Sequence, residues 1–333
     1  MTGFKEDVRP EPSHRPRLRI GVIGARRVRE GTGPFMALHA ASLGAEVPWV
    51  LTTNQRSAAE AEAWLAGRGL RTRGTAAATD LAGAGLDAVF IATPSGSHQA
   101  WLDWSLQAGL SALCEKPLVA DPQLDSTGWQ QQVEGLSGFA LAFAGAGLLL
   151  SESCQWPFTL KAFRQLHPEV DLAAVQCLKM EMAPAAAGRV AWLESLSHPL
   201  SLLQEVAPGR GDFTEIRYQS LAGGLRLQAR YLAGSRQLEL QVDLRQTEEY
   251  PRPAGFSLDG FQCRRVVREP GYRIFFQDPA DPKREVESGD PTKMLIAHFF
   301  RRLKESRGRI LQPDVALLRR QRLLAKLLAA HGS

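Results

Sequence analysis

The sequence predicts an α/β protein in which a doubly wound parallel sheet is followed by an α+β domain with an open, largely antiparallel sheet. In the first half of the chain, continuous apolar runs alternate with amphipathic segments, a pattern typical of parallel strands covered on both faces. After about residue 153 several runs alternate apolar and polar residues, as in a sheet with one solvated face. The length of 333 residues fits about two domains.

The predicted elements follow from these patterns. In the first half, strands are expected at 18–24, 45–52, 86–94 and 110–117, and helices at 34–43, 57–69 and 98–109. In the second half, helices are expected at 157–166 and 189–206, strands at 213–221, 224–232, 236–244, 262–269 and 272–278, and closing helices at 291–308 and 313–330. We expect a flexible tail over 1–17, a first domain over 18–153 and a second over 154–333.

Composition argues against several classes of protein. The net charge is +5, but the basic residues are scattered, so a nucleic-acid partner is not expected. The longest apolar run, 139–150, is shorter than the roughly 20 residues of a membrane span, and we expect it to form buried core. The four cysteines include no C-x-x-C pair, which argues against disulfides and fits a cytoplasmic protein. No histidines and carboxylates have metal-ligand spacing, so no metal is expected.

The stretch GVIGARRVREGTGPF, residues 21–35, is a candidate nucleotide-binding turn. Gly24 ends the first strand, and Gly31, Thr32 and Gly33 precede the first helix. A strand, a glycine turn and a helix are how a dinucleotide-binding fold begins. Backbone amides at the helix N-terminus bind phosphate, and glycine lets the pyrophosphate approach closely.

Cationic and neutral polar residues near this turn bear on the choice of cofactor. Arg26, Arg27 and Arg29 are either contacts to cofactor phosphates or part of a solvated loop. The second predicted strand ends in VLTTNQRS, where a carboxylate would bind the ribose of NAD. Thr52, Thr53 and Arg56 stand there instead, which favours NADP while leaving NAD possible. The alternative is that Arg56 simply begins a helix and faces solvent.

Two motifs carry a resemblance to a known family. DAVFIATPSGSH, residues 87–98, and AGLSALCEKPLVAD, residues 108–121, resemble the Gfo/Idh/MocA family of NAD(P)-dependent oxidoreductases. The resemblance implies a Rossmann domain over 18–153 that holds the cofactor, with Thr93, Pro94, His98 and Glu115 near it. It implies an α+β domain over 154–333 that binds a small-molecule substrate. That domain would form a homo-oligomer, a dimer or tetramer, through its sheet.

The same resemblance identifies catalytic candidates. It places Lys116 beside the nicotinamide and the reacting oxygen, where an ammonium stabilises developing negative charge. It also points to Glu194 and His198, whose i, i+4 spacing predicts one helical face. A histidine titrating near neutrality can accept a hydroxyl proton. Pro199 disfavours an unbroken helix, so His198 is expected at a kink or a helix start. The alternative is a partly buried structural histidine.

Gln155 and Trp156 lie where the chain crosses between the predicted domains. They are candidates for substrate contact, although Trp156 is equally well explained as a packed aromatic at the junction.

The predicted function is hydride transfer between a nicotinamide and a secondary alcohol or ketone of a sugar, cyclitol or related molecule. NADP is the expected cofactor. A second hypothesis is a catalytically impaired family member that acts as a nucleotide- or metabolite-binding sensor or partner subunit, since the glycine loop is altered. A third is a reductase of another substrate, such as an imine or a tetrapyrrole.

Overall fold

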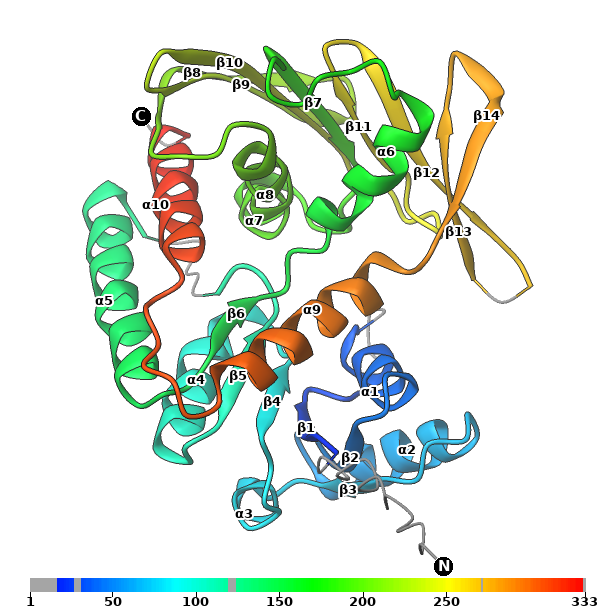
Figure 1. The fold of residues 1–333 in the computed structure, drawn as a ribbon, viewed down its shortest axis with the longest axis vertical. Helices are drawn as coiled ribbons and strands as arrows, with labels where there is room; N and C mark the ends of the chain where they lie inside the picture. Colours follow the sequence, from blue (N-terminus) through cyan, green and yellow to red (C-terminus); the bar gives the residue numbers. More distant parts are fainter. Residues whose placement is uncertain (1–16, 27–30, 119–123, 271, 332–333) are drawn as a thin grey trace, which may run out of the picture.

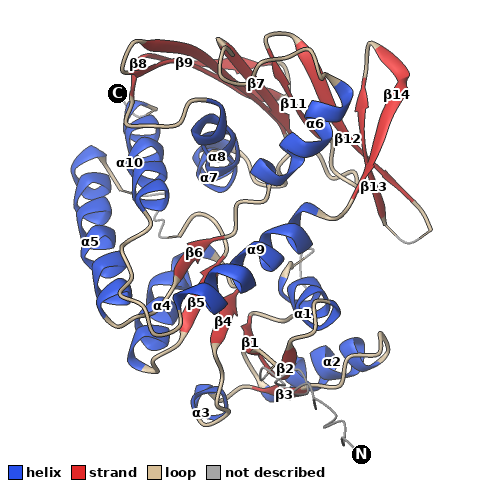
Figure 2. Cartoon of the chain, in the orientation of Figure 1, coloured by secondary structure: helices blue, strands red, loops and turns tan. Residues whose placement is uncertain are grey.

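The structure is a computed structural model that describes residues 17–26, 31–118, 124–270 and 272–331. Within these ranges the chain forms two β-sheets, each packed against helices (Figures 1 and 2). The first sheet is parallel and the second is mostly antiparallel, so the predicted fold class is confirmed.

The parallel sheet positions the candidate site. In the described chain it has six strands in the order β3-β2-β1-β4-β5-β6, and every pairing is parallel. The strands are β1 (Arg19–Ile23), β2 (Glu46–Leu51), β3 (Arg73–Thr75), β4 (Ala88–Ile91), β5 (Ser111–Cys114) and β6 (Leu150–Glu152). The strand order reverses at β1, which lies between β2 and β4. Ligands of doubly wound sheets bind outside the carboxyl ends of the strands at such a switch point.

Helices cover both faces of this sheet. They are α1 (Gly33–Ser42), α2 (Gln55–Ala66), α3 (Ala78–Ala82), the 3-10 turn η1 (Ser95–Ser97), α4 (His98–Gln107), α5 (Ser126–Gly145) and α9 (Pro291–Ser306). Although α9 follows the second sheet in sequence, it packs with α1 and α2 on the first sheet. The rings of Phe299 and Phe300 lie 6.0 and 6.1 Å from that of Phe90 in β4. A segment expected among the closing helices of the second domain therefore completes the core of the first.

The second sheet has eight strands among the described residues, in the order β14-β13-β12-β11-β7-β10-β9-β8. The strands are β7 (Cys177–Met182), β8 (Asp212–Leu221), β9 (Gly224–Ala233), β10 (Arg236–Arg245), β11 (Ala254–Leu258), β12 (Phe261–Arg268), β13 (Arg273–Asp278) and β14 (Asp281–Ser288). β7 pairs with β10 in parallel, and the other pairings are antiparallel. The sequence patterns missed β7, β11 and β14, which are held in place by neighbours distant in sequence.

Helices pack on one face of the second sheet (Figure 1). They are the 3-10 turn η2 (Trp156–Thr159), α6 (Leu160–Leu166), α7 (Gly188–Ser195), α8 (Ser197–Val206) and α10 (Val315–Ala330). Ion pairs join neighbouring strands of the sheet, among them Arg226 with Asp243 at 2.7 Å and Arg273 with Glu287 at 2.6 Å. The expected homo-oligomeric contact through this sheet stays a prediction.

The described residues contain neither a membrane-spanning helix nor a cluster of metal-ligand side chains. None of the helices has the length and apolar character needed to cross a membrane. No group of three or more histidines, cysteines or carboxylates is arranged to hold a metal ion. The apolar run 139–150 is divided between α5 and β6, and Leu141 on α5 is 59% exposed. The expectation that the whole run is buried was therefore wrong, because one side of α5 faces solvent.

Candidate active site

Two glycines shape the turn after β1. Gly24 has φ +89°, and a Cβ there would lie 2.5 Å from the carbonyl oxygen of Ala92. A Cβ on Gly33, the first residue of α1, would collide with the carbonyl oxygen of Gly24. Both positions require glycine, because the backbone is left-handed at one and backbone segments touch at the other. The turn thus brings strand, helix N-terminus and the loop after β4 together, which is the arrangement that admits a pyrophosphate.

Polar residues connect this turn to β5 and β6. The Thr32 hydroxyl donates to Oε1 of Glu115 at 3.3 Å, and the Ser153 hydroxyl donates to the same oxygen at 3.1 Å. Glu115 therefore links the N-terminus of α1 to the carboxyl ends of both strands. Gly31 directly precedes Thr32, and Arg26 is exposed at the start of the loop. Arg27 and Arg29 lie outside the described residues.

The end of β2 departs in part from the prediction. The Thr52 hydroxyl donates to the Asn54 carbonyl at 3.1 Å and accepts from the Ser57 hydroxyl at 2.9 Å. Thr52 is buried and its hydroxyl is used inside the turn, and its expected contact with the cofactor stays a prediction. Thr53 is exposed. Arg56 lies in the first turn of α2, 90% exposed at its side chain, and pairs with Glu60 at 3.1 Å.

His98 ties together the loops after β4 and β5. Its Nδ1 lies 2.9 Å from the Pro117 carbonyl oxygen, and its Nε2 lies 2.8 Å from the Thr93 carbonyl oxygen. The ring is buried, so it positions both loops. Pro94 follows Thr93 in the first loop, and the Thr93 hydroxyl accepts from the Ser97 hydroxyl at 2.8 Å.

Lys116 lies between the buried Cys114 and Pro117, and it is half-buried. The peptide bond from Lys116 to Pro117 is cis. Among the described residues, no carboxylate pairs with its ammonium. Its ammonium belongs to the loop at the carboxyl end of β5, beside Glu115.

His198 lies in the first turn of α8, as expected from the proline that follows it. Its side chain is buried, and Nδ1 has no hydrogen-bond partner in the described chain. Burial lowers the pKa of His198 well below its ordinary value, and the positive charges of Lys116, Arg265 and Arg320 lower it further. The imidazole is therefore neutral at pH 7 and able to accept a proton.

The expected contact between Glu194 and His198 is not formed. The helical run breaks at Leu196 between α7 and α8, and Glu194 is exposed whereas His198 is buried. No hydrogen bond or ion pair joins them in the part of the chain that the structure describes. The break agrees with the interruption expected from Pro199, but the spacing of four residues does not give the two side chains the same burial.

Trp156 is buried in the core of the second domain and touches the site. Its ring lies 6.3 Å from that of His198 and 6.2 Å from that of Phe256, with edge-to-face geometry at both. Gln155 precedes it and is half-buried. Most of the Trp156 ring is therefore packed in the core, as the packed-aromatic alternative expected. One edge contact of the ring is with His198.

Sequence reasoning missed a buried polar cluster behind His198. Glu152, at the end of β6, accepts from Nε of Arg320 at 2.5 Å and from Nε2 of Gln321 at 2.8 Å. It also accepts from the hydroxyl of Ser197 at 3.3 Å. A carboxylate ending the apolar run LLLSE was a signal, but its partners lie up to 169 residues away.

Arg265 on β12 was also missed. It is half-buried, and its Nη2 donates to the carbonyl oxygen of Arg252 at 2.7 Å. Alternation along QCRRVVRE puts Arg265 on the same face as Cys263, which is buried in the core. The alternation of side chains could be predicted from the sequence. The sequence did not show which face of β12 lies toward the site.

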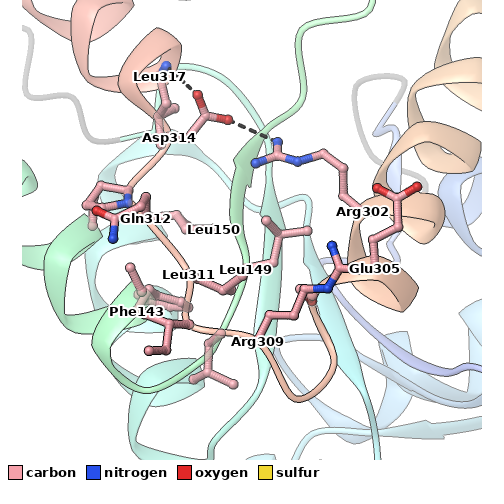
Figure 3. Close-up of a pocket in the computed structure, with 16 residues that line it drawn as sticks. Phe143, Leu149, Leu150, Arg302, Glu305, Arg309, Leu311, Gln312, Asp314 and Leu317 are labelled. Atoms are coloured by element: carbon pink, nitrogen blue, oxygen red, sulfur yellow. Dashed lines mark hydrogen bonds and ion pairs between the residues drawn. The ribbon is translucent and has the colours of Figure 1, made fainter.

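A separate cavity of about 290 Å³ lies between α5 and the segment that joins α9 to α10 (Figure 3). Its lining includes Leu149 and Leu150, where β6 begins, and Arg302, which pairs with Asp314 at 3.0 Å. The candidate active site lies at the opposite, carboxyl ends of the parallel strands. This cavity is therefore distinct from it.

Residues 18–127 match the profile of the Gfo/Idh/MocA family, an oxidoreductase family with an NAD-binding Rossmann fold. The predicted resemblance is confirmed over this segment. No curated protein matches the sequence significantly.

Solved structures resemble nearly the whole chain. UDP-N-acetylglucosamine 3-dehydrogenase GnnA from Acidithiobacillus ferrooxidans has a TM-score of 0.65 and 19% identity, covering 96% of this chain and 100% of that one. The 3-ketoreductase KijD10 from Actinomadura kijaniata, in complex with NADP and TDP-benzene, has a TM-score of 0.64 and 18% identity, covering 93% and 96%. An oxidoreductase from Agrobacterium radiobacter, in complex with NAD⁺, L-tartaric acid and magnesium, has a TM-score of 0.62 and 14% identity. The match covers 96% of this chain and 98% of that one. At these identities the likeness shows the fold.

Proposed function

We propose that the protein is an NAD(P)-dependent oxidoreductase acting on a secondary alcohol or ketone of a sugar, cyclitol or related small molecule. The observation that carries the proposal is that Lys116, whose charge acts on the buried His198, follows Glu115, which bonds to Thr32 in the glycine turn of the parallel-sheet domain. The family match over the first domain supports it.

The nicotinamide cofactor supplies the hydride acceptor or donor. In the oxidative direction, the Lys116 ammonium donates a hydrogen bond to the substrate oxygen and stabilises its developing negative charge. The imidazole of His198 accepts the hydroxyl proton as hydride leaves the same carbon. In reduction His198 returns that proton to the carbonyl oxygen. Trp156 shields the back of the imidazole from water.

The turn residues fit a dinucleotide. Gly24 and Gly33 leave room for the pyrophosphate at the N-terminus of α1, and Thr32 and Glu115 border that space. Thr53 and Arg56 lie beyond β2, where the adenosine ribose of a dinucleotide is bound. With no carboxylate between Thr52 and Arg56, NADP is the favoured cofactor and NAD the alternative.

The test is a pair of titrations followed by a turnover assay. Nicotinamide fluorescence is followed as NADPH and NADH are added separately, and sugar nucleotides are then assayed first. They come first because the similar structures include a UDP-N-acetylglucosamine 3-dehydrogenase and a 3-ketoreductase. We expect tighter binding of NADPH, and turnover that Lys116→Met lowers about 10²- to 10³-fold without weakening cofactor binding. A folded protein that binds neither cofactor would refute the proposal.

One observation favours a second candidate, a nucleotide-binding sensor or partner subunit. Glu194 is exposed and does not contact His198, so the catalytic pair implied by the family resemblance is incomplete. Tight cofactor binding without turnover on sugars, sugar nucleotides, sugar acids or cyclitols would support this candidate over the enzyme.

A further inference from the structure

Arg265 belongs to the wall of the site that the second sheet provides. On β12 it lies two residues from Cys263, which is paired with Phe256 on β11. Phe256 packs on Trp156, and Trp156 packs on His198. Side chains two residues apart point to the same side of a sheet, so Arg265 projects on the side that carries this aromatic chain. Its charge contributes to the lowered pKa of His198, as expected for a neighbour.

The charge of Arg265 reaches one of two tyrosines that are hydrogen-bonded to each other. Tyr250 precedes β11 and Tyr272 precedes β13, and their hydroxyl oxygens are 3.3 Å apart. The charge of Arg265 acts on Tyr272 as it does on His198. This end of the sheet therefore supplies a guanidinium and phenolic hydroxyls, which are donors suited to oxyanions.

The cations around His198 differ in their partners. Arg320 is paired with the buried Glu152. For Lys116 and Arg265, the described residues contain no carboxylate within ion-pair distance. A half-buried guanidinium with one backbone acceptor keeps most of its five donors for another group. Two such cations whose charges both act on His198 favour a ligand that brings negative charge.

We propose that Arg265 binds an anionic group of the substrate, a carboxylate or a phosphate, while Lys116 and His198 hold the carbon that is oxidised or reduced. This inference rests on the proposed function and narrows its substrates to sugar acids or sugar phosphates, including sugar nucleotides. The cofactor phosphates are not the anion in question, because their place is the glycine turn after β1. Arg265 comes instead from the second sheet, on the substrate side.

The experiment measures binding to the NADPH-loaded protein by calorimetry with three probes: UDP-glucose, glucuronate and glucose. UDP-glucose carries a diphosphate, glucuronate carries a carboxylate, and glucose is uncharged. Variants Arg265→Gln and Arg265→Lys are compared with Arg264→Gln, a matched control at the exposed neighbouring position on the other face of β12. Thermal unfolding establishes that each variant is folded.

We expect at least one anionic probe to bind, and Arg265→Gln to weaken it roughly tenfold to hundredfold, the value of a charge-assisted hydrogen bond. Arg264→Gln should change binding less than about twofold, and Arg265→Lys should fall between them. A response to UDP-glucose identifies phosphate as the anion, and a response to glucuronate identifies carboxylate. Failure of both anions to bind, or equal binding to Arg265→Gln, would overturn the inference.

The control for the underlying proposal is separate. NADPH binding is measured on the same variants, and we expect it to be unchanged in Arg265→Gln. If wild-type protein fails to bind NADPH, the proposed function fails. The probe titrations on the cofactor-free protein then still report whether Arg265 recognises an anion.

Discussion

Two arginines near His198 have opposite environments. Arg320 is buried, donates to Glu152 at 2.5 Å and to Oε1 of Gln204 at 2.7 Å. Arg265 is half-buried and donates to one backbone carbonyl. A fully buried charge without a counter-charge costs several kcal/mol, so the protein must neutralise Arg320 internally. Arg265 keeps contact with water and needs no internal partner. Arg320 on α10 is therefore bound to Glu152 at the end of β6, whereas Arg265 is the cation that we propose for a ligand.

The largest expected effect comes from removing the carboxylate of the buried pair. Glu152→Gln keeps the shape of the side chain but leaves Arg320 without a counter-charge. We expect the free energy of unfolding to fall by about 3–5 kcal/mol, measured by urea denaturation. The double variant Glu152→Gln/Arg320→Met removes both charges and should recover much of the loss. A single variant as stable as the wild type would mean that Arg320 is not held by this pairing.

Lys116 should behave as a ligand-facing cation. Lys116→Met removes the charge from a half-buried position and should lower kcat about 10²- to 10³-fold, as loss of an oxyanion donor does. Stability should change by less than about 1 kcal/mol, because no ion pair is broken. The comparison of kcat with the urea midpoint tests this, with Lys179→Met on an exposed strand position as control. A large loss of stability with unchanged kcat would show that Lys116 stabilises the fold and does not act on the substrate.

The lowered pKa of His198 makes the stability of the protein depend on pH. Its pKa in the folded protein is lowered, so below its ordinary pKa the unfolded chain binds the extra proton. Stability should therefore fall as the pH drops below about 6.5, by at most about 1.4 kcal/mol per unit. Urea unfolding at pH 7.5, 6.5 and 5.5 measures the slope. His198→Gln should have a shallower slope than the wild type.

Arg265→Gln sharpens the same measurement. It removes one of the positive charges that lower the pKa of His198, so that pKa should rise. The acid limb of kcat/KM in the oxidative direction should then move to higher pH. Arg264→Gln, on the other face of β12, should leave it in place. An unmoved limb in Arg265→Gln would show that the guanidinium does not act on the imidazole.

The smallest expected effect belongs to a fully solvated cation. Arg56 is 90% exposed at its side chain and already pairs with Glu60. If it contacts the 2′-phosphate of NADP, Arg56→Ala should weaken NADPH binding about three- to tenfold and leave NADH binding unchanged. Fluorescence titration with both cofactors makes the comparison. Equal small changes for both would indicate a solvated residue without a role in cofactor choice.

Prediction from the sequence succeeded where neighbours in the chain decide the structure. The seven strands and helices expected over 18–117 are all present, although β3 and α3 were missed, and His198 lies at a helix start because Pro199 follows it. It was incomplete where contacts between distant segments decide the environment of a side chain. Glu194 and His198 are four residues apart, yet one is exposed and the other is buried, and the hydroxyl of Thr52 is bonded within the turn after β2.

The sequence by itself determined the fold class and the glycine turn at Gly24 and Gly33, because periodicity and turn chemistry are properties of adjacent residues. Its motifs over 87–98 and 108–121 carried the resemblance to the Gfo/Idh/MocA family. Only the tertiary structure decided that Glu152 pairs with Arg320, 168 residues away, and that α9 returns to the first sheet. It alone placed the charge of Arg265 where it acts on His198. Charge pairing and burial depend on which distant segments the topology brings into contact. A local sequence pattern does not predict those contacts.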